Sequence, residues 1–333
     1  MNKRLSTLLK VGITVAGLAI VLWRIPAKEI FQVLREASWN WVLVAFLLVV
    51  ASLFLRAFRW QILLRGLKAK VGYLRLVELY FAGNFFNAFL LSGFGGDVVR
   101  ILEVARDVPG NVATGTVIVD RITGLVMLFV MALLVLPFRP EGFSSTLTMV
   151  ILVSCLAGLI ASFILLEGSL IRRFGRWLPG KLSPTGDGPV ARVLEAVQGC
   201  GWRAIAGALG VSAIFNLMLV GWWYSAGRAL GYEIPYTHYL LVVPLLSMAL
   251  LVPSVGGLGV RELLAPYLFS SAALESSDAA TQAVALSLLV FIIMRMASLL
   301  GAPVYILSTI RRGHQTTAEH QDEPLTSGES QDS

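Results

Sequence analysis

The sequence predicts an all-α membrane protein that crosses the bilayer several times. Of its 333 residues, 56% are hydrophobic and only 14% are charged, whereas soluble domains carry about 25% charged residues. Apolar runs long enough to cross a hydrocarbon core of about 30 Å recur along the chain. The alternating ten-residue pattern of a membrane β-barrel is absent from the sequence. Helices embedded in lipid are therefore the expected architecture.

Six apolar runs are long enough for full spans, and they cover residues 6–23, 39–55, 111–137, 146–166, 204–230 and 279–310. Two further apolar segments, 76–106 and 236–270, are each interrupted by glycines that leave two short arms. Irregular backbone at membrane depth is tolerated only inside protein or beside a water-filled cavity. These two segments are therefore predicted to be re-entrant hairpins or discontinuous helices.

The positions of lysine and arginine predict the orientation, because cytoplasmic loops of membrane proteins are enriched in these residues. One basic block follows the second run and contains Arg56, Arg59, Arg65, Lys68, Lys70 and Arg75. Loop 167–203 is also basic, and Arg311 and Arg312 follow the last run. Both chain termini are therefore predicted to be cytoplasmic. Residues 313–333 are polar and lack periodicity, which predicts a disordered tail.

With this orientation the membrane domain, residues 1–312, divides into halves at about 1–140 and 141–312 that run through the membrane in opposite directions. Paired, glycine-interrupted segments in two such halves are typical of transporters with inverted-topology repeats, and they mark a binding site near the bilayer midplane.

The two interrupted segments share a pattern, LLSGFGGDVVR at 90–100 and LVPSVGGLGVR at 251–261. The matched positions are Gly95, Gly96 and Arg100 in the first segment, and Gly256, Gly257 and Arg261 in the second. A helix that begins at such a break carries a partial positive charge that attracts anions, and arginine holds phosphate in a bidentate fork. The two helix starts and two arginines are expected to face one shared cavity. The alternative is structural: glycines allow tight helix packing, and Asp97 caps a helix and pairs with Arg100.

Seven polar residues lie in or next to apolar runs, namely Glu78, Asn84, Asn87, Asp120, Arg121, Glu262 and Arg295. Charges at such positions are costly and usually pair inside the helix bundle. Asp120 and Arg121 point about 100° apart on a helix, so each is expected to find a partner elsewhere. Arg121 with Glu78 and Arg295 with Glu262 are the pairings considered. The seven residues either line a polar site or make structural contacts between helices.

The sequence predicts neither a metal nor a cofactor. The two cysteines do not form a disulfide framework or a metal site, and no histidine has a partner at ligand spacing. Neither G-x-G-x-x-G nor the P-loop pattern occurs, so nucleotide binding is not expected. The net charge of +7 lies in short blocks between apolar runs, which suits orientation in a membrane and not nucleic-acid binding. Monomer and homo-oligomer both stay open.

Three segments taken in order, NFFNAFLLSGFGGDVVR (84–100), TGTVIVDRITGL (114–125) and LVPSVGGLGVRE (251–262), resemble a flippase-like membrane family. This family includes the transmembrane region of lysylphosphatidylglycerol synthase and stand-alone bacterial and archaeal proteins. The resemblance implies an eight-segment fold with re-entrant parts, in a prokaryotic cytoplasmic membrane, that moves polar lipids across the bilayer. It also implies that Asp97, Arg100, Arg121, Arg261 and Glu262 lie at the site. The soluble aminoacyl-transfer domain has no counterpart in this sequence, so lysine transfer is not expected.

The expected function is that of a flippase for a phosphate-bearing lipid, either a membrane phospholipid or a polyprenyl phosphate. A transporter for a small soluble anion is one alternative, because the same helix ends and arginines would serve it. A scaffold for a lipid-modifying enzyme is another. A membrane-embedded enzyme is less expected, because the sequence shows no nucleophile–base or carboxylate pair at short spacing.

Overall fold

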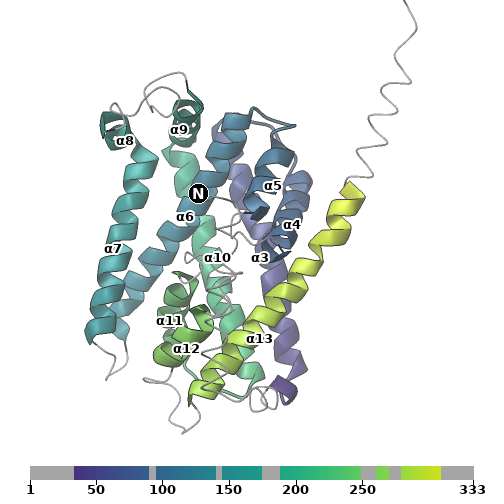
Figure 1. Ribbon diagram of the computed structural model, residues 1–333, viewed down its shortest axis with the longest axis vertical. Helices are drawn as coiled ribbons and strands as arrows, with labels where there is room; N and C mark the ends of the chain where they lie inside the picture. The colour runs from purple at the N-terminus through teal and green to yellow at the C-terminus, as the bar shows by residue number, and fades with distance from the viewer. Residues whose placement is uncertain are drawn as a thin grey trace, which may run out of the picture.

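The computed structural model describes residues 34–89, 95–139, 145–174, 188–248, 260–269 and 279–308. In these ranges the regular structure is helical throughout (Figure 1), so the all-α prediction is confirmed there. Five of the helical segments are long and apolar enough to cross a membrane: Trp39–Gly66, Gly110–Phe138, Thr148–Glu167, Trp202–Ala229 and Ala279–Ser308. They coincide with five of the six predicted spans. The sixth, 6–23, lies outside the described residues, as does the predicted tail.

The first described span, α3 (Trp39–Gly66), is eleven residues longer at its C-terminal end than the predicted run 39–55. The helix continues because apolar residues keep recurring at helical spacing, and Trp60, Leu63 and Leu64 are all buried. Arg56 and Arg59 consequently lie inside a helix of the bundle. Their assignment to a basic loop was wrong.

The centre of the bundle is the pairing of α3 with α10 (Trp202–Ala229), the most extensive contact between any two described helices. Small and apolar residues such as Ala45, Val49, Val220 and Ala226 form this contact. The contact continues into the helices α6 (Gly110–Val135), which is followed by the short 3-10 turn η1 (Leu136–Phe138), and α13 (Ala279–Leu299).

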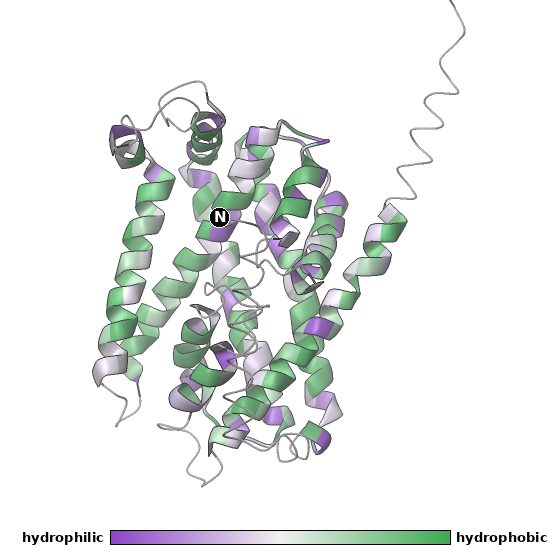
Figure 2. Ribbon diagram, in the orientation of Figure 1, coloured by the Kyte–Doolittle hydropathy of each residue, from purple (hydrophilic) through white to green (hydrophobic). Residues whose placement is uncertain are grey.

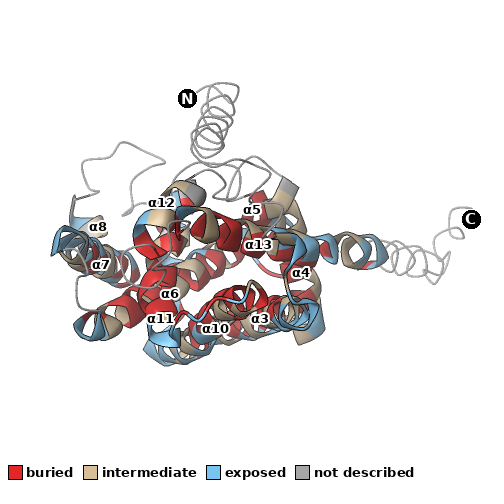
Figure 3. Cartoon of the chain, turned by 90° about the horizontal axis from the view of Figure 1, so that it is seen from below, coloured by how far each residue is buried: buried red, intermediate tan, exposed pale blue. Residues whose placement is uncertain are grey.

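The peripheral helix α7 (Ser145–Glu167) packs against α6 with one face only. Ile151 and Cys155 on this face are buried, whereas Val153, Ile160 and Phe163 are exposed. The helix is mainly hydrophobic along its length (Figure 2) although much of it is exposed (Figure 3). An apolar face without protein cover is what lipid-facing helices present.

The two glycine-interrupted segments each form a pair of short helices. The first pair is α4 (Tyr73–Phe89) and α5 (Gly95–Val104), which pack on each other, and the second is α11 (Tyr236–Met248) and α12 (Val260–Phe269). Helices α4 and α5 lie in the upper half of Figure 1 and α11 and α12 in the lower half. The short helices α8 (Ser169–Phe174) and α9 (Pro189–Gly199) cover the upper end and belong to the basic loop.

Candidate functional site

A cavity of about 270 Å³ opens between the α4–α5 pair and the long helices. Its lining comes from α3, α4, α5, α6, α10 and α11, and comprises Arg56, Arg59, Tyr80, Gly83, Asn84, Asn87, Asp97, Arg100, Asp120, Arg121, Gly124, Leu125, Leu128, Phe215, Asn216, Leu219 and Ser247. Charged and amide side chains thus share one cavity with leucines. Such a combination of apolar walls and few convergent polar groups is typical of ligand sites.

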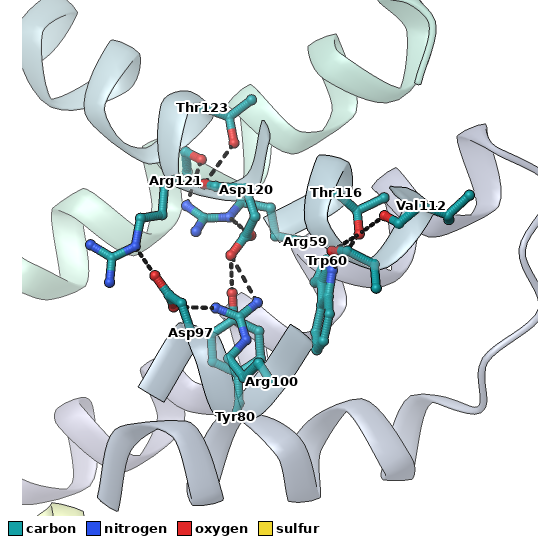
Figure 4. Close-up of polar contacts among 12 residues, drawn as sticks. Arg59, Trp60, Tyr80, Asp97, Arg100, Val112, Thr116, Asp120, Arg121 and Thr123 are labelled. Carbon is teal, nitrogen blue, oxygen red and sulfur yellow. Dashed lines mark hydrogen bonds and ion pairs between the residues drawn. The ribbon is translucent and has the colours of Figure 1, made fainter. Parts of the chain in front are cut away.

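Asp120 is the centre of a buried ionic network on one side of the cavity. The Nε of Arg59 donates to Oδ1 of Asp120 at 2.7 Å, and Nη2 of Arg100 donates to Oδ2 at 3.1 Å (Figure 4). The hydroxyl of Tyr80 also donates to Oδ2. Asp120 is only 1% exposed. Paired arginines and a hydroxyl are what such a buried carboxylate needs to remain ionised.

Asp97, in the first turn of α5, connects this network to a third arginine. Its Oδ1 accepts from Nη1 of Arg100 at 3.3 Å, and its Oδ2 accepts from Nε of Arg121. Arg100 therefore bridges two carboxylates, and each carboxylate oxygen of Asp97 and Asp120 already accepts a hydrogen bond from an arginine (Figure 4). The predicted pairing of Arg100 with Asp97 one turn earlier is formed.

The guanidinium of Arg100 lies against two aromatic rings, which themselves pack edge to face. Its Cζ lies 3.8 Å from the ring centroid of Tyr80 and 4.3 Å from that of Trp60. The indole N–H of Trp60 donates to the hydroxyl of Thr116 at 3.1 Å, which fixes the ring. Cation–π contacts of this kind gain strength when the groups are shielded from water, so the orientation of Arg100 is determined before any ligand arrives.

The Thr116→Val variant tests the support of this aromatic ring. Valine keeps the shape of threonine but removes the acceptor, and leaves a buried indole donor unsatisfied. We expect the free energy of unfolding to fall by about 1–3 kcal/mol. The matched control is Thr114→Val in the same helix, whose hydroxyl bonds to the Gly110 carbonyl at 2.8 Å. Thermal unfolding in detergent compares the two variants; equal losses would contradict the assignment.

The Gly-Gly pair brings α5 close to α4. Gly95 and Gly96 are both buried, and the amide N–H of Gly96 donates to Oδ1 of Asn87 at 2.7 Å. A Cβ atom on Gly96 would overlap the carbonyl oxygen of Gly83, and a Cβ on Gly83 would lie 2.9 Å from the side chain of Arg100. The structural alternative for the glycines, tight packing, is therefore realised, and the same packing positions Arg100 at the cavity.

Positive charge exceeds negative charge in the described lining of the cavity. Four arginines, Arg56, Arg59, Arg100 and Arg121, face two aspartates. Arg56 lies over the rings of Phe215 and Tyr80 at 5.2 and 5.5 Å. Among the described residues no carboxylate lies within ion-pair distance of it. A network with a purely structural role needs no more arginines than carboxylates, because each unpaired charge inside an apolar bundle is costly. The surplus of arginines therefore calls for another explanation.

Comparison with known proteins assigns the chain to a family. The profile of the lysylphosphatidylglycerol synthase TM region matches residues 7–298. The chain belongs to this family. A UPF0104 membrane protein of Pyrococcus horikoshii is 23% identical over 297 residues, which is 81% of this chain and 88% of the relative. A UPF0104 membrane protein of Archaeoglobus fulgidus is 25% identical over 287 residues, which is 78% of this chain and 85% of that relative.

For this member of the lysylphosphatidylglycerol synthase TM region family, the structure brings together part of the predicted site. Six predicted residues line the cavity, namely Asn84, Asn87, Asp97, Arg100, Asp120 and Arg121, and Gly95 and Gly96 form the adjacent helix start. Gly256, Gly257 and the side chain of Glu262 lie outside the described residues. The geometry groups these residues around a cavity, and their role in binding stays a prediction.

The prediction that Arg100 and Arg261 face one shared cavity is wrong for this cavity, because Arg261 does not line it. Arg261 is buried elsewhere, with Nη2 donating to the Ser287 carbonyl at 3.4 Å and Cζ 5.4 Å from the ring of Trp223. Helix α12 packs against α11 and α13, and not against α5. The two arginines therefore lie on helices that face different neighbours.

Two more predicted residues also lie away from the cavity lining. Arg295 packs over Phe291, with Cζ 4.6 Å from the ring centroid. Glu78 pairs with Arg75 at 3.6 Å, and the pairing of Arg121 with Glu78 is wrong because Arg121 pairs with Asp97. Arg75 also pairs with Glu103 at 2.9 Å, so these charges form a separate ionic cluster.

Sequence reasoning missed Arg56, Arg59, Tyr80, Ser212 and Asn216. Arg59 is the principal partner of Asp120, and its Nη1 also donates to Ser212 Oγ at 3.0 Å. The available signal was the i, i+3 spacing of the two α3 arginines together with apolar residues that continue beyond them. Nothing local distinguishes Tyr80 or Asn216 from other residues of apolar helices.

Proposed function

We propose that this protein moves a phosphate-bearing polar lipid between the two leaflets of a prokaryotic cytoplasmic membrane. The observation that carries the proposal is the surplus of arginines around a cavity inside the membrane-spanning bundle. A phosphate supplies the missing negative charge, and arginine is the side chain best suited to hold it.

The dimensions of the cavity favour a headgroup over a whole lipid. Cavities that enclose drug-sized ligands measure about 300–1,000 Å³, and this one is slightly below that range at about 270 Å³. The acyl chains would therefore remain in the bilayer while the headgroup occupies the cavity. Leu125, Leu128 and Leu219 in the lining suit the apolar part of such a lipid.

The arrangement of the short helices supports an inverted-repeat transporter. The α4–α5 and α11–α12 pairs occupy opposite halves of the bundle (Figure 1), as re-entrant segments entering from opposite sides would. Interrupted segments of this kind surround the substrate in transporters that expose one site alternately to the two sides. We propose that the α4–α5 hairpin is one of the two elements that alternate.

Replacing Arg121 tests the proposal, because its side chain is 38% exposed and lines the cavity. The Arg121→Gln variant should lower the rate of lipid movement in liposomes by at least about tenfold, since a charged hydrogen bond contributes about 1.5–3 kcal/mol. The rate is followed by loss of labelled phosphatidylglycerol from the outer leaflet. Arg106→Gln is the control, because Arg106 is 66% exposed and pairs with Glu103 outside the cavity.

The outcomes separate the candidate functions. Equal rates for Arg121→Gln and the wild-type protein would exclude the cavity as the route. Absence of lipid movement combined with uptake of radiolabelled inorganic phosphate would favour a small-anion transporter. Absence of both, with the protein folded, would favour a scaffold for a lipid-modifying enzyme.

A further inference from the structure

The charges around the cavity limit the kind of headgroup that it can bind. Natural phospholipids share a phosphate but differ in whether the group beyond it carries an amine. An ammonium group needs carboxylates, carbonyl oxygens or free aromatic faces around it. The described lining contains carboxylates and aromatic rings.

The carboxylates of the described lining already accept hydrogen bonds from arginines. Oδ1 of Asp120 accepts from Arg59 at 2.7 Å and Oδ2 from Arg100 at 3.1 Å. Oδ1 of Asp97 accepts from Arg100 at 3.3 Å, and its Oδ2 accepts from Arg121. An ammonium at either aspartate would compete with an arginine already bound there, and it would add a cation to a lining in which arginines outnumber carboxylates.

The aromatic rings at the cavity likewise already contact arginines of the protein. The guanidinium of Arg100 covers Tyr80 at 3.8 Å and Trp60 at 4.3 Å, and Arg56 and Arg59 lie over Phe215 at 5.2 and 5.9 Å. A choline or lysine headgroup depends on such faces when carboxylates are absent. The aromatic rings of this cavity already hold cations of the protein itself.

An uncharged donor remains. Asn216 lines the cavity, is only 1% exposed, and its Nδ2 has no hydrogen-bond partner among the described residues. Buried polar atoms in native structures are nearly always satisfied, so such an atom calls for an explanation. A hydroxyl or phosphate oxygen of a ligand would accept from this amide, whereas an ammonium group has no lone pair to offer.

We propose that the cavity selects a phosphate headgroup that carries no amine, such as a glycerol phosphate or a polyprenyl phosphate. Phosphate oxygens meet the surplus arginines, and a hydroxyl or phosphate oxygen meets Asn216. Lysylphosphatidylglycerol, the lipid in the family's description, carries two amines and is disfavoured here. The inference rests on the proposed function only in taking the ligand to be a lipid.

The test compares lipids that differ in their amines. Full-length protein in liposomes receives labelled phosphatidylglycerol, phosphatidylethanolamine or lysylphosphatidylglycerol, and the rate of movement between leaflets is measured for each. We expect phosphatidylglycerol to move at least about tenfold faster than either amine-bearing lipid, because like charges in a desolvated site cost several kcal/mol. Equal rates, or faster movement of lysylphosphatidylglycerol, would overturn the inference and leave the proposed function intact.

Two variants connect the selectivity to its residues. Arg56→Gln should reduce the ratio of the phosphatidylglycerol rate to the phosphatidylethanolamine rate, and Asn216→Leu should lower the phosphatidylglycerol rate. The ratio compares two lipids on one protein sample, so a partial loss of folded protein does not change it. Arg139→Gln is the control, because Arg139 is exposed and does not line the cavity. An unchanged ratio in Arg56→Gln would contradict the role of the surplus charge.

Two further measurements distinguish a failure of the headgroup selectivity from a failure of the proposed function. Uptake of soluble glycerol phosphate and ethanolamine phosphate distinguishes a free anion from a lipid headgroup. Native mass spectrometry of the detergent-solubilised protein with equal amounts of the three lipids measures binding without transport. Preferential binding of phosphatidylglycerol, or uptake of glycerol phosphate alone, would support the headgroup selectivity even where no lipid moves and the proposed function fails. Binding without preference would contradict the selectivity.

Discussion

The Asp120→Asn variant is expected to lose about 3–5 kcal/mol of stability, the cost of removing one partner from a buried ion pair. Asparagine keeps the size of the side chain and can still accept from Tyr80. It cannot compensate the charges of Arg59 and Arg100, which the bundle holds at 2.7 and 3.1 Å from the carboxylate. Arg59 would then lose its carboxylate partner, and Arg100 would keep only Asp97 among the described residues.

Thermal unfolding in detergent measures this loss against a matched control. Asp107→Asn makes the same substitution at a residue that pairs with Arg75 at 3.6 Å and is 31% exposed in its side chain. This partly exposed pair should contribute about 0–1 kcal/mol. The double variant Asp120→Asn/Arg59→Gln should recover part of the loss, because it removes one of the uncompensated cations. If the double variant is no more stable than Asp120→Asn, charge is not the reason.

The Gly96→Ala variant should have the second large effect, about 3 kcal/mol or more, the upper end for overpacking. The added Cβ would overlap the carbonyl oxygen of Gly83 and lie 2.7 Å from Cγ of Asn87. A backbone carbonyl cannot rotate away as a side chain can, so α4 and α5 must separate. Since α5 carries Asp97 and Arg100, the proposed lipid movement should be lost together with stability.

Gly110→Ala provides the comparison for this substitution. Gly110 lies in the first turn of α6, and a Cβ there meets nothing within 4 Å. Alanine at such a position should be neutral or stabilise by about 0.4–1 kcal/mol. Both stability and lipid movement are measured for the two variants. Equal stability of Gly96→Ala and Gly110→Ala would show that α4 and α5 are not held as closely as described.

The sequence was sufficient to predict the helical class and the five described spans, because hydrophobic length and periodicity are local properties. It also located the helix start at Gly95 and Gly96, since a glycine pair followed by charges cannot continue an apolar span unchanged. Asp97, Arg100, Asp120 and Arg121 stood out because charges in apolar runs are costly.

The missed parts of the site depend on which helices meet. Arg59 was assigned to a loop because the basic block that contains it resembles a cytoplasmic boundary, and only its contact with α6 reveals its partner Asp120. Arg261 repeats the local pattern of Arg100 but packs beside Trp223. Similar local sequences thus lie beside different helices. The pattern within one segment does not specify which helices will pack against it.

The distance along the chain between Arg59 and Asp120 has a consequence for how the protein is made. These partners are 61 residues apart, so ribosomes deliver α3 to the membrane before the carboxylate has been synthesised. An arginine at the centre of an inserting helix costs about 2.5–3.5 kcal/mol. The apolar N-terminal part of α3 must drive insertion while Arg56 and Arg59 remain hydrated near the interface. The burial of Arg59 beside Asp120 then waits for α6, so this ion pair cannot form before α6 has been synthesised.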